Sequence, residues 1–359
     1  MKRKSSEVQL EVVHQNCKYN CRHCFIYTDD RASDEEAKQV AQTLTDQGYG
    51  VRVWASSMEA DGAMELLSEF GAQLAPDGKP DCSVELRDSI PHFMENPPAD
   101  SRFGFSLHGH NAELHDLLVR GRGNFDKVVE SLREAKRRGL ERYYVHHVVH
   151  KKNYKHLHEF CQLMEELSVP QFFITKMVGS PQAMKNVPEM LLEPEEIHEI
   201  VRLGNTLREQ YRGRVVVTLS EAGFGKLFTK RRYSFLKAIC SMMPMQMRHH
   251  CDAGHNMFAV SASTKDVYVC RFFLSAESCK VGHMNDDGTL ELDRPNWKED
   301  FRSNIQKIDE PCRSCGILKW CGGGCRATAM AEHNQLEGEW NAYAGLKSCP
   351  TAAGVYLEY

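Results

Sequence analysis

Three cysteines stand close together near the amino terminus, in the segment CKYNCRHC that runs from residue 17 to residue 24. Cys17, Cys21 and Cys24 are four and three residues apart, so a short loop can turn all three thiols toward one metal centre. A structural zinc ion or an ordinary iron–sulfur cluster takes four protein ligands. A [4Fe–4S] cluster held by three thiolates leaves one iron open, which an amino acid can chelate through its amine and carboxylate. A zinc knuckle or chance clustering is the alternative.

Nine of the fourteen cysteines fall between Cys240 and Cys349. Within that region, PCRSCGILKWCGGGCR carries four cysteines in the order C-x2-C-x5-C-x3-C, at positions 312, 315, 321 and 325. This spacing is not that of a bacterial ferredoxin, and no histidines complete a zinc finger. The three glycines between Cys321 and Cys325 let the backbone turn freely, so these two thiols can face different metal centres. Spacing alone leaves a pair of zinc sites as a rival.

The composition of the 359-residue chain is that of a globular protein, with 42% hydrophobic and 26% charged residues. The net charge of −4 gives no reason to expect a nucleic-acid or membrane-surface partner. No apolar run approaches the ~20 residues of a membrane span. The basic start MKRKSSEVQLEVVH lacks the apolar region of a signal peptide. We therefore expect a cytoplasmic protein, in which clustered cysteines indicate metal binding or catalysis rather than disulfides.

Alternating and Val-rich or aromatic segments predict strands that are interleaved with helices. The expected strands are 7–14, 50–56, 82–87, 102–107, 142–150 and 170–178, and the expected helices are 34–47, 124–139 with Asn124 as N-cap, and 154–167. This order is typical of an α/β fold with parallel strands, here an open or partial (β/α)6 barrel. Chemistry in such folds sits at the C-terminal ends of the strands, and the Cys17 loop follows the first strand.

We divide the chain into three parts. Residues 1–180 form the expected barrel, and residues 181–238 form a connecting helical segment with a helix at 193–213 and a strand at 214–219. Residues 239–359 form a small Cys-rich domain.

The motif Cys17-x3-Cys21-x2-Cys24, placed after the first strand of a partial barrel, resembles the radical S-adenosylmethionine (SAM) enzymes over roughly residues 7–180. The resemblance implies that SAM binds the open iron, that the cluster delivers one electron, and that a 5′-deoxyadenosyl radical abstracts a hydrogen atom from the substrate. The cofactor then carries the hard chemistry, and the barrel positions and shields it.

The resemblance also places several residues at SAM. WASSMEA stands where the family has a Gly-Gly-Glu-Pro-like turn, although the glycines and the proline are absent. FSLHG resembles the family's Ser-Leu-Asp-Gly segment, with His108 in place of the Asp. HDLLVRGRGNFDKV supplies an arginine that can pair with the SAM carboxylate. The expected SAM contacts are Phe25, Ser57, Glu59, Ser106 and Arg120, with Arg122 as the alternative to Arg120.

The C-terminal cysteines resemble the SPASM extension of that family, with Lys265 in place of the usual hairpin glycine. The extension implies two auxiliary [4Fe–4S] clusters, which makes three clusters in all. Carried over by position, the first would be held by Cys240, Cys251, Cys270 and Cys325, and the second by Cys312, Cys315, Cys321 and Cys349. Cys240 precedes the pattern proper. Of the three cysteines left over, Cys161 is expected in the core, and Cys279 is either a buried loop residue or a redox or substrate contact.

Enzymes with this extension mostly act on peptides and proteins, by crosslinking, oxidation, splicing, epimerisation or formylglycine formation. Formylglycine-forming members have an Asp base directly after the hairpin Cys, where this chain has Arg271. A guanidinium cannot accept a proton, which disfavours that reaction. Arg271 is expected either to bind a peptide carboxylate or carbonyl, or to form a structural ion pair.

We therefore expect a radical SAM/SPASM enzyme with a peptide substrate and an electron donor such as flavodoxin or ferredoxin. Only sixteen residues precede Cys17, so leader recognition is assigned to a separate leader-peptide-binding protein or to strand addition on the barrel. The alternatives are a radical SAM enzyme acting on a small molecule or on a folded protein, and a non-catalytic electron-transfer or zinc-scaffold protein. The sequence identifies neither the bond that changes nor a catalytic base.

Overall fold

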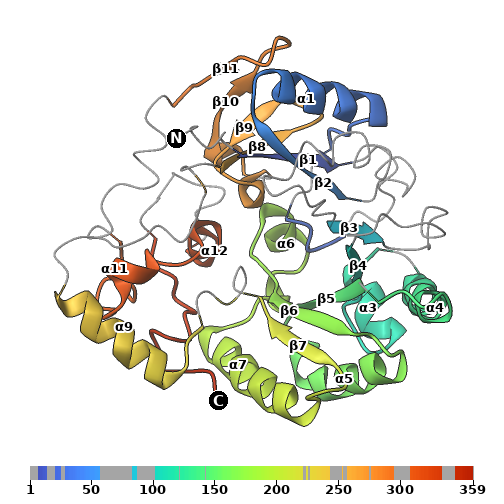
Figure 1. The fold of residues 1–359 in the computed structure, drawn as a ribbon, viewed down its shortest axis with the longest axis vertical. Coiled ribbons are helices and arrows are strands. Elements are labelled where there is room, and N and C mark those ends of the chain that lie inside the picture. The colour runs from blue at the N-terminus through green and yellow to red at the C-terminus, as the bar shows by residue number, and fades with distance from the viewer. Residues whose placement is uncertain are drawn as a thin grey trace.

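The computed structural model is a curled sheet flanked by helices (Figure 1). It describes residues 7–13, 21–25, 29–56, 83–86, 102–120, 122–141, 143–220, 224, 227–242, 253, 257–274, 276–294, 308–333 and 344–358. Within these ranges the strand order of the sheet is β11-β10-β9-β8-β1-β2-β3-β4-β5-β6-β7. The α/β class with a curled parallel sheet, expected from the sequence, is what the structure shows.

The strands β1 to β7 are parallel and follow one another across the sheet. They are β1 (Glu7–Val13), β2 (Gly50–Ser56), β3 (Ser83–Leu86), β4 (Arg102–Ser106), β5 (Tyr143–Val149), β6 (Gln171–Lys176) and β7 (Val216–Leu219). The first six match the predicted strands to within two residues at each end. Parallel neighbours need crossover connections, and those that the structure describes carry helices.

The helices of this part are α1 (Asp34–Asp46), α3 (Ala112–Leu118), α4 (Asn124–Arg137), α5 (Leu157–Glu166), α6 (Pro181–Asn186) and α7 (Pro194–Gln210). Ser33 and Glu36 form a capping box at the start of α1, which satisfies backbone N–H groups that have no partner inside the helix.

The predicted N-cap of α4 is wrong. Gly123, at φ 79°, is the N-cap, and Asn124 is a buried residue of the first turn. The carboxylate of Asp116 accepts hydrogen bonds from the N–H groups of Gly123 (2.9 Å) and Phe125 (3.1 Å). The side chain of Asp116, from the preceding helix, therefore caps the start of α4. The sequence of residues 124–139 alone cannot show this contact.

The two faces of the sheet differ in polarity because side chains alternate along a strand. Val8, Leu10 and Val12 of β1 are fully buried in the core cluster that also contains Leu44 of α1. The alternate residues of β1, Gln9 and Glu11, are buried and polar. The concave face of the sheet thus carries polar groups where the outer face carries the apolar core.

The sheet continues beyond residue 180 on both edges. β7 joins β6, and on the other side β8 (Met257–Ser261) pairs in parallel with β1. β9 (Asp266–Tyr268), β10 (Lys280–Met284) and β11 (Leu290–Glu291) extend that edge in antiparallel order. Lys265, in the β8–β9 turn, adopts the left-handed φ of 59° that glycine favours, so the hairpin forms without the expected glycine. The division of the chain near residues 180 and 238 stays a prediction.

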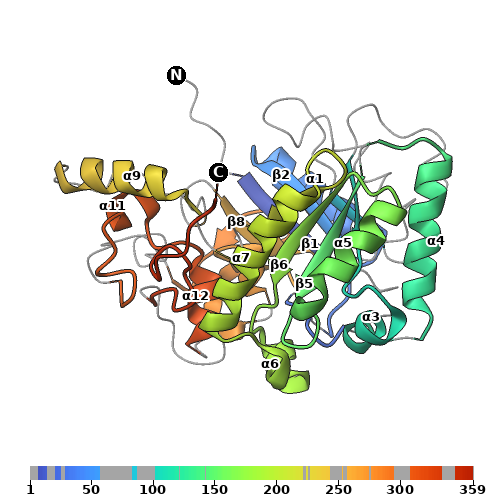
Figure 2. The same cartoon turned by 90° about the horizontal axis from the view of Figure 1, so that it is seen from below.

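The remaining helices are α9 (Lys230–Met242), α11 (Leu318–Cys321) and α12 (Arg326–Glu332). Figures 1 and 2 both place α9 and α11 on one side of the molecule and α4 on the opposite side. Among the described residues, no helix is both long enough and apolar enough to cross a membrane.

Candidate cofactor site

The end of the three-cysteine loop is held at the C-terminal edge of the sheet. Cys17 lies outside the described residues. Cys21 is buried and packs with Cys24 and with Val119, the residue after α3. The Arg22 N–H donates to the carbonyl of Leu118 (2.9 Å), and the Cys24 N–H donates to the carbonyl of Cys21 (3.2 Å). The two described thiols are therefore fixed in a tight turn beneath α3.

Two further contacts tie this loop to the ends of β4 and β6. The ring of His23 stands edge-on to the ring of His108, with centroids 4.8 Å apart. The hydroxyl of Ser180, which follows β6, donates to the carbonyl of Cys24 (3.0 Å). The loop thus lies over the strand ends, where the parallel α/β rule expects chemistry.

The end of β4 is buried and its polar groups are organised by hydrogen bonds. Ser106 is 5% exposed and His108 is 3% exposed. The Val148 N–H donates to Nδ1 of His108 (3.2 Å), which places the proton of the neutral ring on Nε2. The His108 N–H in turn donates to Nδ1 of His115 (3.0 Å). His108, which stands where the family motif has Asp, is therefore held in a fixed orientation by hydrogen bonds.

The other expected SAM contacts are distributed as follows. Ser57 and Glu59 lie outside the described residues. Arg120 is exposed just after α3, and its guanidinium donates to Oδ1 of Asn186 (2.6 Å). Arg122 is also exposed. The turn that leads to Arg120 packs on the Cys21 turn, so Arg120 lies close in sequence to residues that touch the cysteine loop.

Arg271 reaches from the Cys270 turn to the first strand. The Nε of Arg271 lies 2.9 Å from Oε2 of Glu11, whose side chain is fully buried. The backbone N–H of Arg271 donates to Oε1 of Gln9 (3.3 Å). The guanidinium also stacks 5.3 Å from the ring of Phe25, which packs on Phe272 at 5.0 Å. The structure thus contains the ion pair that the sequence left as one of two possibilities. Glu11 was not singled out from the sequence, although its polar position in an alternating strand was a signal for the concave face.

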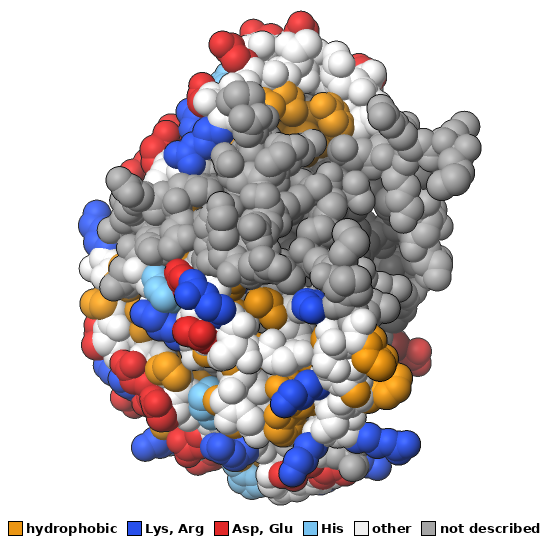
Figure 3. Space-filling model, turned by 90° about the vertical axis from the view of Figure 1, so that its left-hand side faces the viewer, with side chains coloured by type: hydrophobic (Ala, Val, Ile, Leu, Met, Phe, Trp, Pro, Cys, Tyr) orange, Lys and Arg blue, Asp and Glu red, His pale blue; other side chains and the backbone are white. Residues whose placement is uncertain are grey.

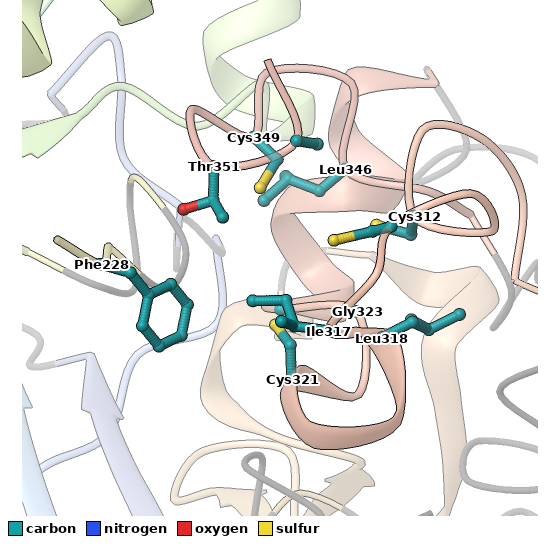
Figure 4. Close-up of a pocket in the computed structure, with 12 residues that line it drawn as sticks. Phe228, Cys312, Ile317, Leu318, Cys321, Gly323, Leu346, Cys349 and Thr351 are labelled. Atoms are coloured by element: carbon teal, nitrogen blue, oxygen red, sulfur yellow. The ribbon is translucent and has the colours of Figure 1, made fainter. Parts of the chain in front are cut away.

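Four thiols of the C-terminal region surround one pocket. Cys312, Cys315, Cys321 and Cys349 line it together with apolar side chains that include Phe228, Ile317, Leu318 and Leu346. In Figure 4 the thiols of Cys312, Cys321 and Cys349 point into this common space. These four cysteines are the set that the sequence assigned to the second auxiliary cluster.

The backbone around this pocket is arranged to accept thiolates. Burial raises the pKa of all four thiols, to about 11 for Cys321 and about 12 for Cys349. Backbone hydrogen bonds oppose that pKa shift, from Leu346 to Cys312, from Ile317 to Cys315, from Gly323 and Gly324 to Cys321, and from Ala352 to Cys349. Apolar walls and hydrogen bonds to sulfur suit a buried iron–sulfur cluster, which takes deprotonated cysteines.

A single metal ion would need a tighter arrangement. In tetrahedral zinc sites the sulfurs lie about 2.3 Å from the metal. No group of three or more His, Cys, Asp or Glu side chains in the described ranges could hold such an ion. The assignment of these four thiols to a cluster and not to zinc stays a prediction.

The cysteines assigned to the first auxiliary cluster are less clearly grouped. Cys251 lies outside the described residues. Cys270 packs in the main core, and Cys325 is the N-cap residue of α12 and packs against that core. Cys240 belongs to a separate apolar cluster, together with Cys315 and other residues of the second thiol group. Among the residues that the structure describes, Cys240 therefore packs beside Cys315 and Cys321 of the second thiol group.

Two of the three cysteines left over are buried thiols. Cys161 of α5 is fully buried in the core, as expected, and burial raises its pKa to about 12. Cys279 is also fully buried, and burial raises its pKa to about 11. Buried thiols of this kind are unreactive, so Cys279 fits the structural interpretation. Cys82 lies outside the described residues.

A pocket of about 500 Å³ opens between the end of β6 and α12. Lys176 lines it, is 4% exposed, and contacts both Glu332 of α12 and the hydroxyl of Ser348 (2.7 Å). Gly179 lines the same pocket and precedes Ser180, which bonds to the Cys24 turn. The pocket therefore lies between the three-cysteine loop and the segment that carries Cys349.

The described residues form a curled parallel α/β sheet with the thiols of Cys21 and Cys24 at its C-terminal edge. The sequence profile of the radical SAM superfamily matches residues 12–164. Residues 12–164 therefore form a radical SAM domain. No curated protein sequence matches the chain.

Solved structures share the fold at low sequence identity. Streptococcus suis SuiB bound to precursor peptide SuiA is 15% identical, with a TM-score of 0.65 over 95% of this chain and 76% of that one. SuiB bound to S-adenosylmethionine is also 15% identical, with a TM-score of 0.62 over 94% of this chain and 75% of that one. Native anSMEcpe with bound AdoMet and Kp18Cys peptide is 15% identical, with a TM-score of 0.65 over 97% of this chain and 94% of that one.

Proposed function

We propose that this protein is a radical SAM/SPASM enzyme that cleaves SAM reductively and abstracts a hydrogen atom from a peptide, as a step in modifying a ribosomally made peptide. The modification would be a crosslink, oxidation, splicing or epimerisation. The observation that carries the proposal is the Cys21–Cys24 turn, held across the ends of β4 and β6 within the matched domain.

In this proposal Cys17, Cys21 and Cys24 hold a [4Fe–4S] cluster. When bound, this cluster would supply the single electron for reductive cleavage of SAM. Phe25, Ser57, Glu59, Ser106 and Arg120 are the proposed SAM contacts. The buried ends of β4 and β6 exclude water from this space, which protects reactive species from side reactions.

The second auxiliary cluster is assigned to Cys312, Cys315, Cys321 and Cys349, because these thiols surround one apolar pocket. The first is assigned to Cys240, Cys251, Cys270 and Cys325, although Cys240 packs beside the second thiol group. The total would be three clusters in one chain.

Two observations support a peptide as the substrate. Relatives of this fold have been solved with peptides bound. The pocket between β6 and α12 has a volume in the range that binds small ligands or single side chains, and it mixes charged and apolar walls. We propose that it receives part of the peptide, with the reacting residue directed toward the Cys24 turn.

The test is reductive cleavage of SAM to 5′-deoxyadenosine by the anaerobically reconstituted protein. We expect about twelve iron atoms per chain from three four-iron clusters. Cys24→Ala should lose about four irons and all 5′-deoxyadenosine formation, whereas Cys161→Ala, which alters a core thiol, should keep both. Activity in Cys24→Ala, or iron far below twelve, would overturn the proposal. Co-expression with a short peptide encoded beside this gene, followed by mass measurement, would identify the reaction.

A further inference from the structure

The helix α9 leaves a mixed apolar and basic face uncovered. Of its thirteen residues only Leu236 and Cys240 are buried. Phe235 is 65% exposed and Met242 is 76% exposed. Arg231, Phe235, Ala238 and Met242 are spaced by four, three and four residues, and all four are exposed. They therefore form one stripe along the outer face of the helix.

Positive charge flanks this stripe. The helix has four basic residues, all of them exposed, and no acidic ones: Lys230, Arg231, Arg232 and Lys237. Two acidic residues lie nearby. Glu358 lies near the start of α9, because its neighbour Leu357 bridges to Thr229. Asp309, which precedes Cys312 by three residues, is paired with Arg313. Figure 3 views the side of the molecule on which α9 lies, and in its lower half hydrophobic and basic side chains adjoin, with acidic side chains among them. The face is complementary to an acidic surface with an apolar centre.

The same helix packs against the wall of the pocket of four thiols. Its inner residues Leu236 and Cys240 pack with Phe228 and Ile317, which line that pocket. The guanidinium of Arg232 lies 5.6 Å from the ring of Phe228. A Cβ at Gly316, next to Cys315, would stand 2.9 Å from Cγ of Lys237, so the lysine stem lies on the backbone of the thiol segment. The outer face of α9 therefore lies about one helix diameter, 10–12 Å with side chains, from the pocket wall at Phe228 and Ile317.

We propose that the outer face of α9 is the docking surface for an acidic one-electron carrier protein of the flavodoxin or ferredoxin type. Docked there, the carrier would exchange one electron with the cluster at Cys312, Cys315, Cys321 and Cys349, the cluster gaining the electron that the carrier loses, or the reverse. This inference rests on the proposed function, because it takes that cluster as given.

The size of the surface suits this partner. A thirteen-residue helix is about 20 Å long. Weak electron-transfer complexes bury less than about 1,200 Å², so one helix and its margins are enough. A basic amphipathic helix can also lie on an anionic membrane. The packing of α9 against the wall of the thiol pocket favours the electron carrier, since electron transfer needs a short path between the two redox groups.

The experiment measures binding of an acidic bacterial flavodoxin to the reconstituted full-length protein by calorimetry. The test variant is Lys230→Glu/Arg231→Glu, with Phe235→Ser as a second. The matched control is Lys127→Glu/Lys136→Glu, which reverses two exposed lysines of α4 on the other side of the molecule.

We expect the α9 charge reversal to raise the Kd about tenfold at low salt, because it turns attraction into repulsion at the interface. The difference should fall to about threefold or less near 0.5 M salt, where screening is strong. Phe235→Ser should weaken binding at both salt concentrations, and the α4 control should leave the Kd unchanged.

Three results would overturn the proposal: an unchanged Kd in both α9 variants, an equal loss in the α4 control, or binding of vesicles containing phosphatidylglycerol with no binding of flavodoxin. With dithionite as the reductant no carrier is needed, so the α9 variants should form 5′-deoxyadenosine at the normal rate. A protein that forms none in any variant would refute the proposed function, whereas the binding data would still decide the docking surface.

Discussion

The buried pair between Arg271 and Glu11 offers the sharpest test of how the C-terminal region is joined to the barrel. The carboxylate of Glu11 is fully buried and the guanidinium is 14% exposed. Removing one partner of a buried pair costs about 3–5 kcal/mol, because the other charge is left without compensation. We therefore expect Glu11→Gln, which keeps the volume of the side chain, to destabilise the protein by about 3 kcal/mol or more.

That free energy converts to a measurable change in melting temperature. Unfolding entropies near 2.1 cal/mol/K per residue give about 0.75 kcal/mol/K for a chain of this length, so a loss of 3–5 kcal/mol lowers the Tm by about 4–7 °C. The assay is anaerobic calorimetry of the reconstituted protein at one fixed scan rate. The double variant Glu11→Gln/Arg271→Met removes both charges and should recover more than about 1 kcal/mol of the loss.

The control is Arg313→Met, which breaks the pair with Asp309, where both side chains are about half exposed. Exposed pairs contribute at most about 1 kcal/mol, so this variant should shift the Tm by less than about 1.5 °C. The reasoning is refuted if Glu11→Gln shifts the Tm no more than Arg313→Met. It also fails if the double variant is as unstable as Glu11→Gln alone.

Three further predictions follow from the thiol pocket and the buried histidines. Cys312→Ser should lose about four iron atoms per chain and keep the rest; complete loss of iron would contradict separate clusters. Gly345→Ala places a Cβ 2.3 Å from a backbone oxygen of the Cys312 segment, so the iron content should drop. Gly354→Ala is the control, because its Cβ would stand in open space. Its φ of +75° should lower the free energy of unfolding by only about 1 kcal/mol, and the iron should be kept. Burial lowers the pKa of His147 to about 4 and of His150 to about 3, so only the unfolded chain takes up their protons between about pH 6.5 and those values. Stability should therefore fall as the pH drops below about 6.5, by about 1.4 kcal/mol per unit for each histidine. The measurement is the free energy of unfolding from denaturant melts at several pH values. It should change less with pH in His147→Asn and in His150→Asn, which keep a polar group in place of Nδ1, than in His283→Gln. An equal pH dependence in all of these proteins would contradict the pKa shifts.

The strands were predictable because their signal is local. In EVQLEVV the apolar residues occupy one face and the polar residues the other, and the structure confirms a strand with a core face and a concave face. The expected helix limits were nearly right for the same reason. Asn124 failed as a cap because Asp116, eight residues earlier, reaches the same backbone groups from a neighbouring helix.

The grouping of the cysteines shows a similar limit. The resemblance to the SPASM extension already assigned Cys312, Cys315, Cys321 and Cys349 to one centre, and in the structure these four thiols line one pocket. Cys240 is different, because the residues around it in the sequence do not indicate which of the two groups of cysteines it lies with. Packing of α9 on the Cys315 segment places it beside the second group.

By itself, the sequence determined the alternation of strands and helices, the loop of three thiols and the spacing of the C-terminal cysteines. These are short-range patterns, which depend on backbone geometry and on the periodicity of side chains. Only the tertiary structure decided that Arg271 meets Glu11 across 260 residues of chain, and that Ser180 joins the Cys24 turn to the end of β6. It also decided that α9 packs against the wall of the thiol pocket. Such contacts form because the curled sheet brings distant segments to one edge, and no local pattern records which side chains will meet there.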